Sequence, residues 1–296
     1  MVLRKNVKWR MTILVKLLVA PFLLVGCSGV EVLNALAPQQ GVEKVENVTF
    51  QNEHNLQLDI YRPSAKRFKS QSDLPVIVFY WGGRWQEGDK AMYDFLGREL
   101  ATRGFITVIP NYRLWPDVGF KGFLTDSADA FDWVDKQIAG YGGDRESIFL
   151  MGHSAGAYNA VMLALNTPFS RGINQKLAGA IGISGPYDFL PFSADEGDLK
   201  QIFAPAAEYP LTQPINWADG KNAPLLLIHS EDDQIVYAKN AINLYCAVEA
   251  QGGEAELKLV ASQSHPMMIG VVSNILSWRA PVADWVEHFV GKHSRD

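Results

Sequence analysis

The stretch Gly152-His153-Ser154-Ala155-Gly156 is the part of this sequence that decides the fold. It fits the pattern Gly-x-Ser-x-Gly, follows the apolar run 147–151 and precedes the alanine-rich run 155–165. The first run is typical of a buried strand and the second of a helix. A sharp strand-to-helix turn exposes the central serine, and glycines flank it because side chains would collide in so tight a turn. The pattern therefore favours Ser154 as a nucleophile over a chance glycine loop.

Strands and helices alternate on both sides of this turn. Segments 45–50 and 56–61 alternate apolar and polar residues, which predicts an antiparallel hairpin. Continuous apolar strands separated by helices indicate a mostly parallel sheet covered on both faces. We expect one α/β domain over 45–296. The further predicted strands are 76–80, 106–109, 148–151, 178–184, 225–229 and 257–260, and the predicted helices are 91–103, 123–139, 155–165, 237–251 and 281–291.

Composition narrows the class of protein. The chain has 296 residues, of which 48% are hydrophobic, so it can bury the core of one large domain. Its net charge is −5 and no long basic run follows the N-terminus, which argues against a nucleic-acid surface. Two cysteines are too few for a disulfide scaffold. Cys246 shares a helical spacing with Ile242, Tyr245 and Glu249 and is expected to be a small core residue.

The N-terminus has the layout of a secretory signal. Basic residues within 4–10 precede an apolar run over 11–25, which ends in Leu24-Val25-Gly26-Cys27. This ending resembles the lipobox of bacterial lipoproteins, which implies a signal peptide over 1–26, a lipidated Cys27 and a tether over 27–44. In that class Ser28 after the cysteine implies anchoring at the periplasmic face of the outer membrane. The alternative is an uncleaved anchor helix with an incidental cysteine.

Segment 185–222 interrupts the alternation of strands and helices. It is long, aromatic and rich in Pro, Asp and Ala. Connections of this length in compact domains are usually binding loops or lids. We expect a small lid over the site, with a plain surface loop as the alternative.

A serine nucleophile needs a base and an orienting acid. In strand–turn–helix hydrolases the partners follow in the order Ser, Asp or Glu, then His. His265 lies late, after the strand 257–260, and is assigned as general base. Asp233, after the strand 225–229, is the preferred acid, and Asp188 after an earlier strand is the alternative. Asp232 is expected to stabilise the turn.

The other histidines fit structural positions better. His54 lies in the predicted hairpin turn, and His288 and His293 lie in or after the last helix. His153 should point away from the serine, and His229 should pack beneath the acid loop.

An oxyanion hole is expected beside Ser154. The amide after the nucleophile, that of Ala155, supplies one donor, and the loop after the strand 76–80 supplies another. That loop begins Trp81-Gly82-Gly83-Arg84-Trp85, and its glycines let the amides of Gly83 and Arg84 turn toward a substrate. The Arg84 side chain either faces solvent or reaches toward an acidic substrate.

Together these residues resemble the α/β-hydrolase superfamily, within the esterase and lipase group related to hormone-sensitive lipase. The resemblance covers 56–289 and rests on Trp81-Gly82-Gly83-Arg84-Trp85, Asn111-Tyr112-Arg113-Leu114, Tyr141-Gly142-Gly143-Asp144, the elbow at Ser154 and the late acid and base. The group's loop usually begins with His and carries three glycines, whereas Trp81 and Arg84 stand here. The usual N-terminal cap is missing, which implies an open site covered by 185–222.

The resemblance implies a serine hydrolase that acts on carboxylic esters, with short-chain acyl or acetyl groups on small molecules or glycans, and needs neither cofactor nor metal. Five aromatic residues are candidates for the pocket wall, with Trp85 and Tyr187 foremost: Trp85, Trp115, Tyr158, Tyr187 and Phe189. Two alternatives stay open. One is an amidase, formamidase or peptidase using the same triad, and the other is a non-catalytic binding protein on a hydrolase fold.

Overall fold

The computed structural model describes residues 29–64, 73–194 and 196–294. The predicted signal peptide over 1–26 and the predicted lipidation site Cys27 lie outside these residues. Within the part of the chain that is described, no helix is both long enough and apolar enough to cross a bilayer.

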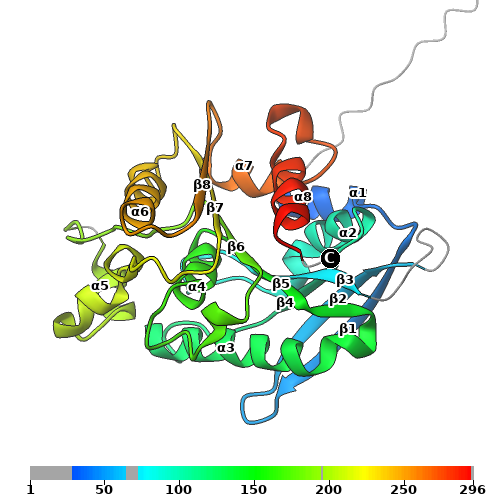
Figure 1. The fold of residues 1–296 in the computed structure, drawn as a ribbon, viewed down its shortest axis with the longest axis horizontal. Coiled ribbons are helices and arrows are strands. Elements are labelled where there is room, and N and C mark those ends of the chain that lie inside the picture. Colours follow the sequence, from blue (N-terminus) through cyan, green and yellow to red (C-terminus); the bar gives the residue numbers. More distant parts are fainter. Residues whose placement is uncertain (1–28, 65–72, 195, 295–296) are drawn as a thin grey trace, which may run out of the picture.

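An eight-stranded sheet forms the centre of the molecule, in the order β1-β2-β4-β3-β5-β6-β7-β8 (Figure 1). The predicted hairpin is confirmed: β1 and β2 are antiparallel, and β2 also pairs antiparallel with β4. All other neighbouring strands are parallel, as the continuous apolar runs predicted. The strands are β1 (Val42–Gln51), β2 (Leu56–Pro63), β3 (Leu74–Tyr80), β4 (Ile106–Pro110), β5 (Gly143–His153), β6 (Gly179–Ile183), β7 (Leu225–Ser230) and β8 (Ala255–Val260).

Helices cover both faces of the sheet, with α2 and α8 on one face and α3, α4 and α6 on the other (Figure 1). The α-helices are α1 (Gly29–Leu36), α2 (Asp94–Thr102), α3 (Phe120–Gln137), α4 (Ala155–Ala164), α5 (Gly197–Ile202), α6 (Lys239–Ala250), α7 (His265–Gly270) and α8 (Val282–His293). Short 3₁₀ turns are η1 (Lys90–Tyr93), η2 (Ile138–Tyr141), η3 (Ile173–Gln175), η4 (Ala206–Thr212), η5 (Pro214–Trp217) and η6 (Ser277–Arg279).

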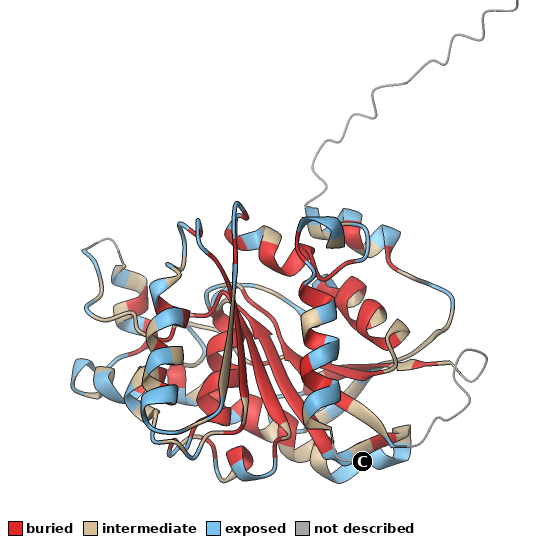
Figure 2. Cartoon of the chain, turned by 45° about the horizontal axis from the view of Figure 1, so that its top comes forward, coloured by how far each residue is buried: buried red, intermediate tan, exposed pale blue. Residues whose placement is uncertain are grey.

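The central strands carry the core because they are covered on both faces (Figure 2). Residues 76–80 of β3 are all 0% exposed. The chain leaves β3 for β4 on one side of it and returns to β5 on the other side. Sheets of this kind bind ligands at the carboxyl ends of the strands where the order reverses. Tyr80 of β3 pairs with Gly152 of β5, so the two loops that follow these strands meet at that point.

The beginning of the described chain lies within the tether expected over 27–44, and it has regular structure there. Residues 29–36 form helix α1, which buries Leu33, and Ala37 beyond its end is also buried. The Asn34 side chain donates hydrogen bonds to the carbonyls of Ala91 and Met92, at 3.1 and 3.2 Å, and accepts one from the amide of Phe95 at 2.9 Å. This segment is therefore packed on the domain. Its helical spacing of apolar residues was obscured by the polar residues and proline around it.

Cys246 is exposed, so its assignment to the core is wrong. Helix α6 turns a neighbouring stripe inward, with Ala241, Leu244 and Val248 each 0% exposed. The sequence of this helix contains two stripes at helical spacing. The stripe of Ala241, Leu244 and Val248 packs on the sheet, and the stripe that contains Cys246 does not.

Candidate active site

Ser154 stands at the tight turn between β5 and α4. Its backbone has a φ of +55°, which is strained for a residue with a side chain. A Cβ on Gly152 would lie 2.2 Å from the carbonyl oxygen of Gly156, and one on Gly156 would lie 2.0 Å from that of Tyr80. Both glycines are thus required by backbone contacts. The absence of side chains at these two positions lets α4 follow β5 after a single residue, and it places Ser154 at the carboxyl end of β5.

His265 and Asp233 complete a hydrogen-bonded chain with this serine. The Nδ1 of His265 lies 2.7 Å from Oδ2 of Asp233, and its Nε2 lies 2.8 Å from Oγ of Ser154. A carboxylate can only accept, so Nδ1 carries the proton and Nε2 is free to accept from the serine hydroxyl. Asp233 follows β7, and His265 is the first residue of α7 after β8.

The surroundings of Asp233 keep it ionised. Burial alone would raise its pKa, but the hydrogen bond from His265 and those from the amides of Val236 and Ile235 outweigh burial and hold the pKa below its usual value. The two amides donate to Oδ1 at 3.0 and 2.9 Å. The carboxylate therefore has one oxygen fixed by the backbone and the other directed at His265.

Two further histidines pack around the triad and remain neutral. His153 donates from Nε2 to the carbonyl of His265 at 3.1 Å, and burial, followed by the proximity of His265, lowers the pKa of His153 to about 3. His229 donates to the carbonyl of Val236 at 2.7 Å beneath the acid loop, and burial lowers its pKa as well. Because both are neutral, neither opposes a positive charge that forms on His265.

The alternative acid lies elsewhere. Asp188 accepts a hydrogen bond from the amide group of Asn243 at 2.6 Å, and it makes no contact with His265 among the hydrogen bonds between described residues. Asp232 accepts from the amide of Ser262 at 2.8 Å, which ties its own turn to the loop after β8. Of the three aspartates, Asp233 alone is placed to orient the base.

The loop after β3 lies against the nucleophile. A Cβ built on Gly82 would be 3.0 Å from that of Ser154. Gly83, Arg84 and Trp85 have φ values of +134°, +56° and +58°, so three consecutive residues take the left-handed conformation. Such a run needs support from its surroundings. On the other side of the serine, Ala155 is the first residue of α4, where an amide has no partner within the helix.

Arg84 pairs with the insertion over 185–222, although 46% of its side chain stays exposed to solvent. Its Nε and a terminal nitrogen lie 2.7 and 2.9 Å from the two carboxylate oxygens of Asp198, which is in the first turn of α5. Gln86 donates to the same carboxylate at 2.8 Å. The Arg84 guanidinium holds the pKa of Asp198 well below its usual range. These contacts join the loop after β3 to the insertion.

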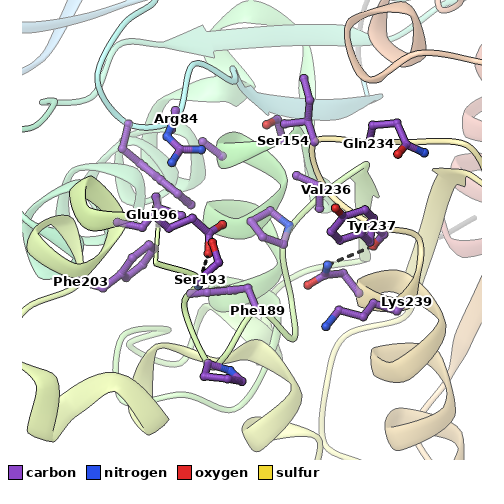
Figure 3. A pocket seen from close by; sticks show the side chains of 17 residues that line it. Arg84, Ser154, Phe189, Ser193, Glu196, Phe203, Gln234, Val236, Tyr237 and Lys239 are labelled. Atoms are coloured by element: carbon purple, nitrogen blue, oxygen red, sulfur yellow. Dashed lines mark hydrogen bonds between the residues drawn. The ribbon is translucent and has the colours of Figure 1, made fainter.

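A pocket of about 570 Å³ opens beside Ser154 (Figure 3). One wall comes from the insertion and the loop after β3, and the other from the acid loop and the start of α6. Sequence reasoning missed this second wall, although its residues directly follow Asp233. The lining residues are Arg84, Trp85, Ser154, Ala155, Pro186, Phe189, Pro191, Ser193, Glu196, Leu199, Phe203, Gln234, Ile235, Val236, Tyr237, Lys239 and Asn240.

The aromatic candidates divide between wall and core. Trp85 and Phe189 line the pocket, and the indole nitrogen of Trp85 donates to Asn159 at 3.1 Å. Tyr187 does not line it, contrary to expectation. Its side chain is 0% exposed and packs so closely on β6 that a Cβ on Gly182 would lie 2.0 Å from its hydroxyl. Trp115 and Tyr158 are likewise absent from the wall.

No group of three or more His, Cys, Asp or Glu side chains among residues 29–64, 73–194 and 196–294 is arranged to hold a metal ion.

Fold and site together define an α/β-hydrolase, and comparison with known proteins agrees. The BD-FAE family model matches residues 58–248. Because this match covers more than half of the sequence, the chain belongs to the BD-FAE family. Its match ends before His265, so the candidate base lies in the part of the chain beyond it.

Relatives of known name extend the comparison. The isoprenylcysteine alpha-carbonyl methylesterase of Arabidopsis thaliana is 28% identical over 247 residues, which cover 74% of this chain and 56% of that protein. The chain thus spans little more than half the length of such curated relatives.

Solved structures share the fold at low sequence identity. An esterase of Pyrobaculum calidifontis has a TM-score of 0.73 at 20% identity, covering 89% of this chain and 90% of its own. A truncated carbohydrate esterase from gut microbiota has a TM-score of 0.72 at 20% identity, covering 86% and 99%. The predicted α/β-hydrolase fold is confirmed.

Proposed function

We propose that the chain is a serine hydrolase that cleaves carboxylic esters. The observation that carries this proposal is the hydrogen-bonded series Ser154–His265–Asp233, whose serine lines a pocket. A buried carboxylate, a base whose Nε2 carries no proton and a strained, partly exposed serine are the parts that acyl transfer requires. The esterase names of the relatives support the same reaction class.

In the proposed reaction, Oγ of Ser154 attacks the ester carbonyl while Nε2 of His265 takes its proton. Asp233 stabilises the imidazolium that results. The amides of Ala155, Gly83 and Arg84 stabilise the negative charge on the carbonyl oxygen. His265 then protonates the leaving alcohol, and water hydrolyses the acyl-enzyme with the same base.

We propose short acyl groups, such as acetyl, on small molecules or glycans. The pocket of about 570 Å³ must hold both the acyl and the alcohol portions of an ester. Insertion 185–222 forms one of its walls and is tied down by Asp198, which limits the length of either portion.

We also propose that the protein is anchored by lipid at Cys27 in a bacterial cell envelope, at the periplasmic face of the outer membrane. The support is the sequence Leu24-Val25-Gly26-Cys27 at the end of an apolar run. Mass spectrometry of the membrane-extracted protein tests this, because an unmodified Met1 or Cys27 contradicts it.

A fluorophosphonate probe tests the function. The wild type should gain a single adduct that peptide mapping places on Ser154, and Ser154→Ala should gain none while keeping its fold by circular dichroism. Hydrolysis of p-nitrophenyl acetate should vanish in the same variant. Anilide and ester substrates that carry the same acyl group then distinguish an esterase from an amidase. Folded wild type without an adduct refutes the proposal and favours a binding protein.

A further inference from the structure

Exposed apolar side chains gather around the N-terminal helix. Among the described residues, ten large hydrophobic side chains are exposed, and half of them belong to α1, η1 or the segment between α7 and α8. We call these five the α1 patch: Val32 at 38%, Leu36 at 58%, Met92 at 41%, Ile275 at 39% and Trp278 at 76% exposure. A contiguous patch of exposed apolar side chains on a protein surface often marks an interaction site.

The members of the α1 patch are brought together by packing beneath them. Val32 and Leu36 are four residues apart on α1 and share one face of it. Leu33 of α1 and Leu276 both lie within 4 Å of a Cβ built on Gly270, at 3.6 and 3.5 Å, so α1 and the segment that carries Ile275 and Trp278 both pack beside Gly270.

Met92 joins the patch from the other side. The Asn34 side chain of α1 donates to its carbonyl at 3.2 Å. Figure 1 shows α1 and the segment after α7 side by side at the upper right, and Figure 2 shows exposed residues on their outer surface.

We propose that the α1 patch rests on a lipid bilayer. Helix α1 begins at Gly29, two residues after Cys27, and an extended chain covers at most about 7 Å in two residues. A lipid on Cys27 would bring the bilayer to the first turn of α1. An uncleaved anchor over 11–25 would do so within about 14 Å. Either origin of anchoring therefore brings this face of the domain to the membrane surface.

The chemistry of the patch fits the boundary between lipid headgroups and acyl chains. Tryptophan is enriched at that depth because its ring is apolar and its N–H is polar. The guanidinium of Arg279 lies 5.3 Å from the centre of the Trp278 ring and also donates to Gln263 at 3.0 Å. It would supply a positive charge at the level of the lipid phosphates.

Docking by the α1 patch would set the orientation of the active site. The patch borders the C-terminal end of α7, and the N-terminal residue of the same short helix is His265. Docking would therefore hold His265, and with it the site, at a fixed distance from the bilayer.

Tryptophan quenching tests the contact in the full chain. The protein is reconstituted in phosphatidylcholine vesicles with or without brominated acyl chains. We expect quenching of the wild type that falls at least about twofold in Trp278→Phe, because Trp278 is the exposed tryptophan of the patch. Trp133→Phe, in α3 on the far side of the sheet, is the matched control and should leave the quenching unchanged.

A second measurement separates docking from anchoring. Residues 29–296 contain all the strands and the whole core that the structure describes, so this domain can be tested alone. It should co-sediment with phosphatidylcholine vesicles, and Leu36→Ser with Trp278→Ser should weaken partitioning by at least about tenfold. Hydrolysis of a soluble ester should not change, since neither residue lines the pocket.

Three outcomes overturn the proposal. The first is equal quenching of wild type and Trp278→Phe, and the second is a domain that stays in the supernatant at all lipid concentrations. The third is a dimer of the wild-type domain that the double variant abolishes, which assigns the patch to a second copy of the chain. Ester hydrolysis is scored separately, so failure of docking leaves the proposed reaction standing.

Discussion

Replacing Asp233 by Asn should remove nearly all catalysis while leaving the shape of the site intact. In the wild type, Oδ1 accepts from two backbone amides and Oδ2 accepts from His265. An asparagine has one oxygen and one NH₂ group to meet three donors. If its oxygen stays with the amides, its NH₂ faces Nδ1 and forces the imidazole proton onto Nε2. If the amide flips, its NH₂ faces the two backbone N–H groups.

The first arrangement is the less costly, since it keeps two hydrogen bonds and changes one tautomer. His265 would then donate to Ser154 instead of accepting from it, and the base would be lost. The charge that stabilises the imidazolium would be lost as well. We expect kcat for p-nitrophenyl acetate to fall by about 10³–10⁴, which corresponds to a barrier higher by about 4–5.5 kcal/mol.

The matched control is Asp188→Asn. Asp188 accepts from Asn243 outside the triad, so its variant should keep kcat within about threefold of wild type. Steady-state kinetics of both variants at pH 7.5, with circular dichroism to verify folding, decide the matter. A folded Asp233→Asn within tenfold of wild type, or a collapse of activity in Asp188→Asn, would refute this assignment of the acid.

Three other perturbations have definite expectations. Gly156→Ala places a Cβ 2.0 Å from the Tyr80 carbonyl and should cost at least about 3 kcal/mol in urea unfolding; wild-type stability would contradict so close an approach. Asp198→Asn removes the carboxylate charge that pairs with Arg84. Both side chains are over a third exposed, so Tm should barely move, whereas kcat should fall roughly tenfold if this ion pair positions the oxyanion loop. The pKa of His153 is lowered from 6.5 to about 3, so below pH 6.5 the unfolded chain takes up a proton that the folded protein does not. The contribution of His153 to stability is therefore fully present above pH 6.5 and falls by up to about 1.4 kcal/mol for each pH unit below it. Urea unfolding at pH 7 and pH 5 should show a smaller loss of stability at pH 5 in His153→Gln than in the wild type.

The parts of the fold that sequence reasoning predicted are those with a local signature. Continuous apolar runs such as 76–80 and 225–229 indicated buried parallel strands, and both are strands in the structure. The tight turn at Ser154 was predictable because glycines two residues before and two residues after a serine, between an apolar strand and a helix, are typical of this turn. The positions of the acid and the base were predicted from the order Ser, Asp or Glu, then His, that strand–turn–helix hydrolases share.

The parts that escaped prediction depend on contacts between distant segments. The ion pair of Arg84 with Asp198 joins residues 114 positions apart, and nothing near either residue indicates it. Tyr187 lies close to the site in sequence, but its ring turns to the core because Gly182 of β6 and Gly185 after that strand leave room for it. Helix α1 is too short to be stable alone and exists through its packing on η1 and α2.

The hydrogen bond between His265 and Ser154 spans 111 residues of chain. The serine, its strained turn and the adjoining strands can all be in place while the base is still absent, because His265 is carried by the segment that follows the last strand added at the sheet edge. Contacts between residues far apart in the sequence slow folding, because the loop-closure entropy is lost before the contact stabilises the fold, so we expect this contact to form late. Any reaction that depends on Ser154 therefore reports on the docking of β8 and α7, and its recovery during refolding should lag behind the recovery of helical signal.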